Sequence, residues 1–117
     1  MPVRPKLFVT GAAGQLGRLV IDILLETVPA SDIVAGMRDP EAHAAAASLL
    51  SGRDVEIRVA DYDRPATLAD AFRGIDRLLL VSGSENGRRR LQHRNVIAAA
   101  KQAGVGLIAY TSILHAD

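Results

Sequence analysis

Apolar runs of strand length alternate along this chain with longer segments of helical periodicity. The runs that predict strands are residues 6–10, 33–37, 55–60, 77–82 and 107–112. The segments that predict helices lie between them, at residues 15–27, 40–50, 65–72 and 88–103. Strands that alternate with helices in this way favour an α/β fold with a doubly wound parallel sheet. Because crossovers between parallel strands are right-handed, we expect the strand order 3-2-1-4-5.

Three of these segments carry finer expectations. In the first predicted helix the apolar residues recur at the spacing of one helical face, which predicts a buried stripe made of Leu16, Leu19, Val20, Ile23 and Leu24. Before the second helix, Asp39 is predicted as the N-cap and Pro40 as the first helical residue. The third strand alternates apolar residues with Glu56 and Arg58, which predicts one wetter face and a place near the sheet edge.

Composition narrows the class of protein. A length of 117 residues fits one domain, residues 1–117, with a core of its own. The net charge of +1 gives no indication of nucleic-acid binding. No apolar segment approaches the ~20 residues that span a bilayer, so we expect no membrane span. The absence of cysteine excludes disulfides and thiolate sites, and it is compatible with the cytoplasmic location that we expect.

A glycine-rich segment between the first strand and the first helix is the strongest functional signal. It follows G-x-x-G-x-x-G spacing after Thr10, and its residues are Gly11, Ala12, Ala13, Gly14, Gln15, Leu16 and Gly17. In such a turn the first glycine permits the tight turn, the second lets a pyrophosphate approach, and the third lets helix and strand pack closely. The helix N-terminus supplies N–H donors and a partial positive charge. The segment therefore predicts a dinucleotide site, and the alternative is a strand–helix turn without a ligand.

The end of the second strand indicates which dinucleotide is bound. NAD-specific sites usually carry an acidic residue there, which holds the ribose 2′-hydroxyl. In this chain the position is taken by Arg38, whose guanidinium can bind a 2′-phosphate and stack on adenine. Asp39 follows it, but its better-supported role is to cap the next helix. We therefore expect NADP(H) to be preferred over NAD(H); the alternative interpretation of Arg38 is a solvated surface arginine.

Two further segments end at the same edge of the predicted sheet. Asp61, after the third strand, is a candidate to bind the adenine amino group, and the alternative is a turn or cap residue. Ser82, Gly83 and Ser84 follow the fourth strand, where the ribose on the nicotinamide side would lie, and the alternative is an ordinary loop. No pair of histidines or carboxylates has metal-ligand spacing, so we expect no metal site.

These motifs together resemble a known family. The segments that carry the likeness are residues 10–17, 34–40, 60–62, 78–82, 92–97 and 107–117. They resemble the NmrA-like atypical short-chain dehydrogenases, and residues 107–117, Leu-Ile-Ala-Tyr-Thr-Ser-Ile-Leu-His-Ala-Asp, narrow the resemblance to the NAD(P)H:quinone oxidoreductase type 2 subgroup.

The resemblance implies a Rossmann-type NADP-binding domain and hydride transfer from NADPH to a small-molecule quinone. It implies cofactor contacts from the glycine segment, from Arg38 and from residues 82–84. Relatives continue with further strands and a smaller C-terminal substrate region, so the resemblance implies that this chain, truncated after the fifth strand, is the N-terminal portion of a longer protein.

Two functions stay open at this point. The Tyr-x-x-x-Lys pair of typical short-chain dehydrogenases is absent, because Tyr62 is followed four residues on by Ala66, and Tyr110 by Leu114. The catalytic acid is therefore not assigned. The first interpretation is a quinone oxidoreductase, since a quinone accepts hydride readily and water can protonate the product. The alternative is a non-catalytic, NADP-sensing regulator.

The last predicted strand, residues 107–112, is apolar on both faces and lies at the predicted sheet edge. An exposed apolar edge strand invites pairing with another chain. We therefore expect these 117 residues on their own to self-associate or to be poorly stable. We also expect weak NADPH binding and no useful quinone reductase turnover from them.

Overall fold

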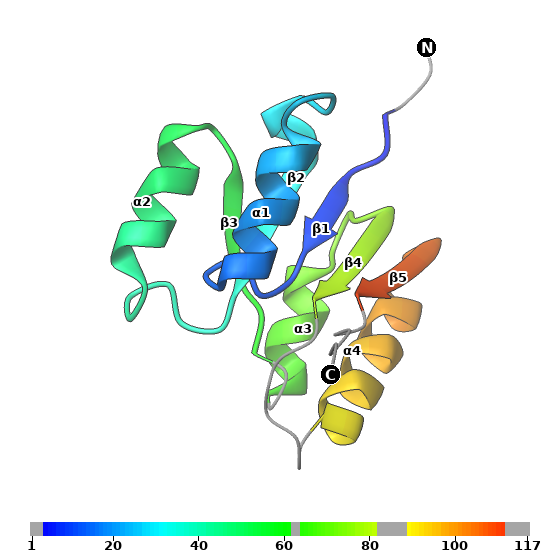
Figure 1. The fold of residues 1–117 in the computed structure, drawn as a ribbon. Coiled ribbons are helices and arrows are strands. Elements are labelled where there is room, and N and C mark those ends of the chain that lie inside the picture. Colours follow the sequence, from blue (N-terminus) through cyan, green and yellow to red (C-terminus); the bar gives the residue numbers. More distant parts are fainter. Residues whose placement is uncertain (1–3, 62–63, 82–88, 112–117) are drawn as a thin grey trace, which may run out of the picture.

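The computed structural model describes residues 4–61, 64–81 and 89–111. Its centre is a sheet of five parallel strands, which are β1 (Leu7–Val9), β2 (Ile33–Met37), β3 (Glu56–Val59), β4 (Arg77–Val81) and β5 (Leu107–Thr111). The strands lie in the order β3-β2-β1-β4-β5, so the predicted fold class and strand order are confirmed (Figure 1). β1 holds the centre, where Phe8 lies opposite Val34 of β2 and Leu78 of β4.

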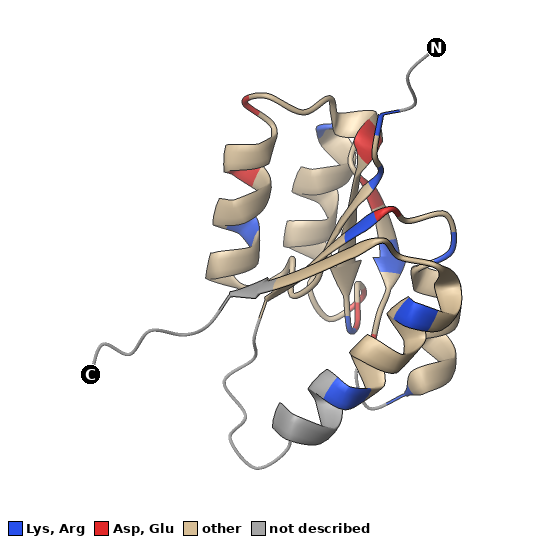
Figure 2. Ribbon diagram, turned by 90° about the vertical axis from the view of Figure 1, so that its right-hand side faces the viewer, with Lys and Arg blue, Asp and Glu red and all other residues tan. Residues whose placement is uncertain are grey.

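Helices cover both faces of the sheet. Within the described residues they are α1 (Gln15–Leu24), the short 3₁₀ helix η1 (Ala30–Asp32), α2 (Ala44–Gly52), α3 (Pro65–Ala71) and α4 (Arg89–Ala103). α1 and α2 lie on one face, and α3 and α4 lie on the other (Figure 1). Basic and acidic residues are both spread over the described part of the molecule, in keeping with the net charge of +1 (Figure 2).

The core between the sheet and α3 and α4 is built around an aromatic pair. The rings of Phe8 and Phe72 meet edge to face, with centroids 5.0 Å apart and planes at 90°. Val34 of β2, Leu68 of α3 and Val96 of α4 pack in the same cluster, fully buried. Edge-to-face pairs contribute roughly 0.5–1.5 kcal/mol beyond their buried area, so the pair fixes the end of α3 against β1.

The core on the opposite face is formed by the strand residues that alternate with these. Val9 of β1 and Ala35 of β2 pack with Ile21 of α1 and Leu50 of α2. β2 is buried at all of its five positions, as expected for a strand that is covered on both faces. The carboxyl ends of β1 and β2 are therefore held from both sides.

The predicted buried stripe of α1 is wrong at three of its positions. Leu16, Leu19 and Ile23 are 41, 54 and 55% exposed, whereas Gly17 and Ile21 are buried. The other two residues of the predicted stripe, Val20 and Leu24, are half-buried. Apolar residues lie on more than one flank of this helix, and the close approach of Gly17 to the preceding loop decides which flank meets the sheet. Hydrophobic periodicity alone does not carry that information.

The predicted start of the second helix is also wrong, because α2 begins at Ala44 and residues 40–43 form a turn. The carboxylate of Asp39 accepts hydrogen bonds from the N–H groups of Glu41 and Ala42, at 3.1 and 3.2 Å. Asp39 therefore acts as a cap, as predicted, but it caps a turn rather than the α-helix. The side chain is turned toward its own loop.

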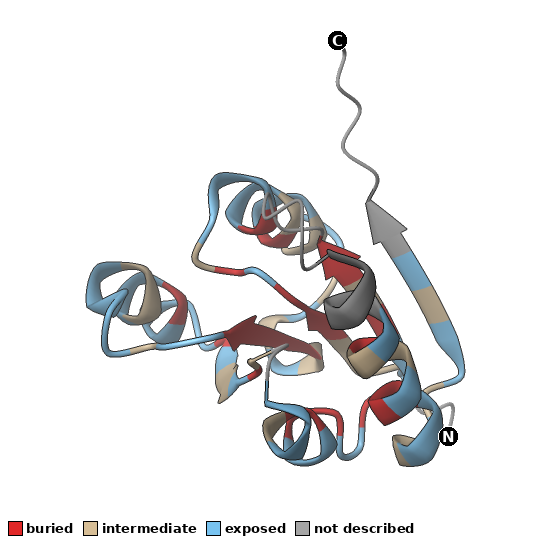
Figure 3. Cartoon of the chain, turned by 90° about the horizontal axis from the view of Figure 1, so that it is seen from below, coloured by how far each residue is buried: buried red, intermediate tan, exposed pale blue. Residues whose placement is uncertain are grey.

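The two edge strands differ in how they are covered. β3 lies at the edge of the sheet, so its predicted edge position is confirmed. The predicted wetter face is wrong, because Glu56 and Val59 are exposed whereas Ile57 and Arg58 are half-buried, so neither face of the strand is the wetter one. On β5, Leu107 is 55% exposed and Ala109 is also exposed, whereas the central strands are buried (Figure 3). β5 is thus less covered than the central strands β1, β2 and β4.

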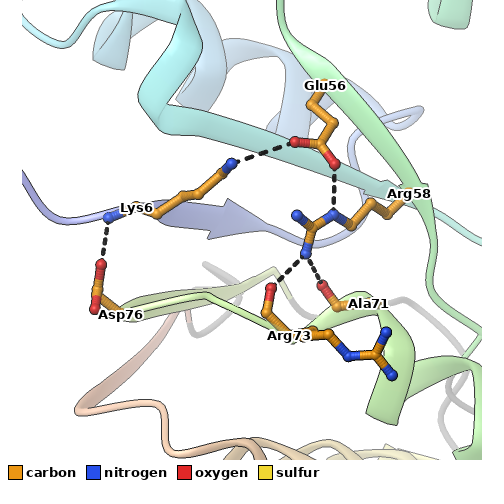
Figure 4. A network of polar contacts seen from close by, with 6 residues as sticks. All are labelled: Lys6, Glu56, Arg58, Ala71, Arg73 and Asp76. Carbon is orange, nitrogen blue, oxygen red and sulfur yellow. Dashed lines mark hydrogen bonds and ion pairs between the residues drawn. The ribbon is translucent and has the colours of Figure 1, made fainter.

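A polar network joins β3 to the end of α3 (Figure 4). One guanidinium nitrogen of Arg58, Nη1, donates to the carbonyls of Ala71 and Arg73, both at 2.8 Å. The Nε of Arg58 donates to Glu56 at 2.7 Å, and the ammonium of Lys6 lies 3.4 Å from the same carboxylate. The hydrogen bond from Arg58 is the main reason that the pKa of Glu56 lies below its ordinary value. A cation thereby sits at the negative end of α3.

Candidate functional site

The loop between β1 and α1 begins where β1 and β4 are tied together. The N–H of Thr10 donates to the carbonyl of Leu79 at 3.1 Å, and the hydroxyl of Thr10 accepts from the N–H of Val81 at 2.8 Å. Thr10 is fully buried, so its hydroxyl has exchanged water for this bond. The loop therefore starts from a fixed point at the carboxyl edge of the sheet. In doubly wound sheets, ligands bind at this edge, where the strand order reverses.

The first glycine makes the turn, and the loop is then fastened to β2. Gly11 has φ +65°, a left-handed conformation that favours glycine. The N–H of Ala12 donates to the carbonyl of Gly36 at 3.0 Å, and the N–H of Gly14 donates back to Gly11 at 3.0 Å. The loop is thus held by β4 on one side and by β2 on the other.

The other two glycines of the motif lie in opposite surroundings. A Cβ on Gly17 would lie 2.7 Å from the carbonyl carbon of Gly11, so only glycine fits where α1 crosses the loop. Among the described residues, a Cβ on Gly14 would meet only the Gly11 oxygen, at an ordinary 3.5 Å. Gly14 is also in extended conformation, with φ −84° and ψ 168°. Gly17 thus serves internal packing, and Gly14 faces open space.

The start of α1 has hydrogen-bond donors to offer. Gly14 is the N-cap of α1, no side chain caps the helix, and no acidic residue lies in its first turn. The N–H groups of the first turn of a helix have no acceptors within the helix and carry a partial positive charge. Gln15 and Leu16 are exposed, Ala13 is half-buried and Ala12 is buried. The geometry suits an oxyanion, and a phosphate group is the form that the motif predicts.

A cavity of about 570 Å³ opens where β2 and β3 end. Its lining residues are Arg38, Asp39, Pro40, Glu41, Val59, Asp61 and Arg64. The structure thus brings together Arg38 and Asp61, which are 23 residues apart and were both predicted as cofactor contacts. Val59 is 46% exposed and gives the cavity an apolar part.

Asp61 is tied to the start of α3. Its backbone N–H donates to the hydroxyl of Thr67 at 3.0 Å, and its carboxylate lies 3.8 Å from the Nε of Arg64. The turn role that was the alternative for this residue is therefore real, and its backbone N–H takes part in it. The carboxylate itself lines the cavity, so an adenine contact stays a prediction for Asp61.

Some predicted residues lie outside the described part of the chain. Ser82, Gly83 and Ser84 are among them, so their predicted contact with the cofactor stays a prediction. Within residues 4–61, 64–81 and 89–111, no three histidine, cysteine or acidic side chains gather as a metal site would require. None of the helices in that same part of the chain is long and apolar enough to cross a membrane.

Sequence reasoning missed what three residues do at this edge, which are Thr10, Gly36 and Arg64. Gly36, the next-to-last residue of β2, packs against a ring, because an added Cβ would lie 2.6 Å from Cζ of Phe8. Its carbonyl also accepts a hydrogen bond from the N–H of Ala12. A glycine inside a strand pattern is a signal of such close approach. The buried hydroxyl of Thr10 and the position of Arg64 in the cavity have no comparable signal in the sequence.

Comparison with known proteins gives the site a context. The family described as NAD(P)H-binding matches residues 11–117. Quinone oxidoreductase 2 of Escherichia coli (strain K12) is 55% identical over 109 residues, which are 93% of this chain and 37% of that protein.

Two solved structures resemble the fold closely. One is the NADPH-dependent quinone oxidoreductase QOR2 of Escherichia coli complexed with NADPH, with a TM-score of 0.84 and 54% identity over 95% of this chain and 38% of that one. The other is the triphenylmethane reductase of Citrobacter sp. complexed with NADP(H), with a TM-score of 0.83 and 46% identity over 94% of this chain and 38% of that one. The chain therefore spans less than two fifths of these relatives.

Proposed function

Because this chain belongs to the NAD(P)H-binding family, we propose that it is the cofactor-binding domain, residues 1–117, of an NADPH-dependent quinone oxidoreductase. The resemblance to NmrA-like proteins and to quinone oxidoreductase type 2 that the motifs predicted is confirmed by the family match and by the relatives. What carries the proposal is one juxtaposition: an uncapped helix start and an arginine-lined cavity share one edge of the sheet.

The glycine loop would hold the pyrophosphate. The N–H groups at the start of α1 follow a loop that β2 and β4 already fix, so little reorganisation would be needed on binding. Gly14 lacks the side chain that would stand between the pyrophosphate and these donors. The same contacts serve NADPH and NADH equally, because the two cofactors share the pyrophosphate.

Arg38 would select NADP(H) over NAD(H). It lines the cavity at the end of β2, and its guanidinium would bind a 2′-phosphate there. Asp39, the carboxylate that could oppose this, accepts two backbone hydrogen bonds from its own turn. Asp61 would bind the adenine amino group from the same cavity, and residues 82–84 would border the ribose on the nicotinamide side.

NADPH, when bound, supplies the hydride from C4 of its nicotinamide. The chain's own contribution is to orient the cofactor against a quinone, an acceptor that needs little acid catalysis because its reduced oxygens can take protons from water. The sequence fits this chemistry, since it lacks the Tyr-x-x-x-Lys pair that alcohol and ketone reductions use. No catalytic acid is assigned within the chain.

The same missing pair favours a second candidate, a non-catalytic protein that senses NADP(H). In that case the bound cofactor would shift an equilibrium with a partner rather than reduce a substrate. Anaerobic oxidation of NADPH by the full-length protein, with and without a quinone, separates the two functions. A quinone reductase consumes NADPH only when quinone is present, whereas a sensor binds NADPH and leaves it unoxidised in both. A triphenylmethane dye as a second acceptor tests the specificity for quinones.

The proposal includes a cytoplasmic location, for which a chain without cysteine is suited. It also includes self-association of this domain on its own through the exposed β5 side. It includes no nucleic-acid partner, and the balanced charge supports this.

A further inference from the structure

Arg64 lines the same cavity as Arg38 but belongs to a different element. It is the N-cap residue of α3, directly before Pro65. Its backbone is held at both polar groups: its N–H donates to the carbonyl of Asp61 at 2.9 Å, and its carbonyl accepts from the hydroxyl of Thr67 at 2.8 Å. The base of the side chain is therefore fixed at the cavity wall.

The guanidinium of Arg64, by contrast, is loosely held. Its side chain is 79% exposed, and its Nε lies 3.8 Å from the carboxylate of Asp61. Charge-assisted hydrogen bonds between such groups are about 2.7–2.9 Å long. An exposed ion pair at the longer distance contributes little, about 0–1 kcal/mol, so a ligand of higher charge can displace it.

The cavity presents a chemistry that suits a phosphorylated nucleoside. Arg38 and Arg64 bring two guanidinium groups to it, and Val59 brings an exposed apolar side chain. Guanidinium planes bind phosphate and stack on aromatic rings. Of the carboxylates that line the cavity, Asp39 is occupied by its own turn, and Asp61 faces Arg64. The third of these carboxylates, Glu41, is exposed and follows Pro40 in the turn.

We propose that Arg64 is a second cation for the 2′-phosphoadenosine end of the cofactor and that it contributes to the choice of NADP(H) over NAD(H). A phosphate monoester carries about −1.5 to −2 charges at pH 7, which a single guanidinium does not balance. On binding, Arg64 exchanges its loose contact with Asp61 for the phosphate. NAD(H) has no 2′-phosphate, so the contribution of Arg64 falls on NADP(H). This proposal rests on the proposed function.

The test compares the binding of two probes, 2′,5′-ADP and 5′-AMP, which differ only in the 2′-phosphate that the first one carries. Both probes are titrated into the unmodified full-length protein and into its Arg64→Gln variant. We expect Arg64→Gln to weaken 2′,5′-ADP binding roughly 3- to 10-fold and 5′-AMP binding less than about 2-fold. Arg64→Lys, which keeps the charge, should recover part of the loss. The matched control is Arg73→Gln, near the other end of α3: its side chain is also 79% exposed and pairs with Asp70, and both affinities should stay unchanged.

Calorimetric titration of each variant, after a urea unfolding curve has shown that it is folded, gives the outcome. Unchanged binding of 2′,5′-ADP by Arg64→Gln, or equal losses for both probes, overturns the assignment of Arg64. The proposed function stands in either case, provided that the unmodified chain prefers 2′,5′-ADP. If the unmodified chain shows no such preference, the NADP(H) preference fails and the role of Arg64 fails with it.

Discussion

Gly14 and Gly17 stand three residues apart at the start of α1, yet a side chain would meet different surroundings at each. At Gly17 it would collide with the backbone of Gly11, and at Gly14 it would extend into open space. One glycine is therefore required by the fold, and the other is available for a ligand. Mutation can separate these two requirements, because the expected damage falls on different properties.

The variant Gly14→Val should keep its fold and lose its cofactor. Extended backbone with φ −84° accepts a β-branched residue, and the added atoms meet nothing closer than 3.5 Å at Cβ. The same atoms would stand where the pyrophosphate must approach. We expect the affinity for NADPH and for NADH to fall sharply and equally, measured by calorimetry. Gly17→Ala is the control, with an expected loss of roughly 1–3 kcal/mol in unfolding free energy. Undiminished affinity in a folded Gly14→Val protein would mean that the loop binds no dinucleotide.

Arg38→Ala should change the cofactor preference. A hydrogen bond to a charged group contributes roughly 1.5–3 kcal/mol, so NADPH binding should weaken by about that free energy. NADH binding should hardly change, because NADH has no 2′-phosphate. The two dissociation constants, measured under the same salt conditions, decide the matter. Equal losses for both cofactors would remove Arg38 from the 2′-phosphate site.

At the scale of single residues, the sequence predicts those roles that depend only on neighbouring residues in the chain. The glycine spacing indicates a tight turn at Gly11, and the structure has it, with φ +65°. The position of Arg38 after a strand indicates the cavity that it lines. Arg64 could not be found in this way, because its place beside Arg38 depends on how α3 packs against the sheet. The bonds of Thr10 likewise join strands that are distant in the sequence.

At the scale of elements, the end of α3 depends on a side chain from β3. Arg58 donates to two carbonyls at that end and to Glu56 beside it (Figure 4). Arg58→Met keeps most of the apolar stem and removes all three bonds, so we expect a loss of roughly 1–2 kcal/mol in unfolding free energy. Arg73→Met removes an exposed arginine from the same helix end and should cost less than about 0.5 kcal/mol. Urea unfolding of both variants measures the difference, and equal losses would contradict the capping role of Arg58.

The same network predicts a dependence on pH. Because the hydrogen bond from Arg58 lowers the pKa of Glu56 in the folded state, the carboxylate stabilises the fold above its unfolded pKa of about 4.3. That contribution disappears as the pH falls through the lowered folded pKa. In Arg58→Met the main cause of the shift is gone, so the gap in stability from the unmodified protein should narrow on acidification. A gap that stays constant between neutral pH and pH ~3 would show that Glu56 takes no part.

The order of the elements could be predicted from the sequence, because the spacing of apolar residues within each short segment indicates whether it forms a strand or a helix. The face that α1 turns to the sheet could not, because Leu16, Leu19 and Ile23 make a second apolar flank of proper spacing. A tertiary contact, the approach of Gly17 to Gly11, selects the flank instead. The late start of α2 has a similar origin, since Asp39 bonds its own turn first.

At the scale of the whole molecule, apolar surface is left open on one side. Asp22 of α1 forms an ion pair with Arg53 beside α2, and Leu19 and Ile23 of α1 are more than half exposed. Arg77 and Leu107 are register partners on neighbouring β4 and β5, and Leu107 is 55% exposed. Val81, on the α1 face of β4, shares that face with Leu107 because alternate strand residues point the same way. The open surface therefore runs from α1 toward β5.

We expect these 117 residues on their own to self-associate through that surface. Light scattering should show species larger than the monomer, and Leu19→Ser combined with Leu107→Ser should reduce them. Asp70→Ser, which changes an exposed charge on the opposite face, should leave the association unaltered. A monodisperse monomer that reduces quinone as fast as a full-length relative would contradict both this expectation and the proposed division of labour.

The most direct measurement of the central claim is a crystal structure of the full-length protein with NADPH. The account predicts the pyrophosphate within hydrogen-bond distance of N–H groups between Ala12 and Gly17, beside the open side of Gly14. It predicts the 2′-phosphate against the guanidinium of Arg38, in the cavity at the ends of β2 and β3. A cofactor bound away from the loop, or a 2′-phosphate that faces solvent and leaves Arg38 untouched, would contradict it.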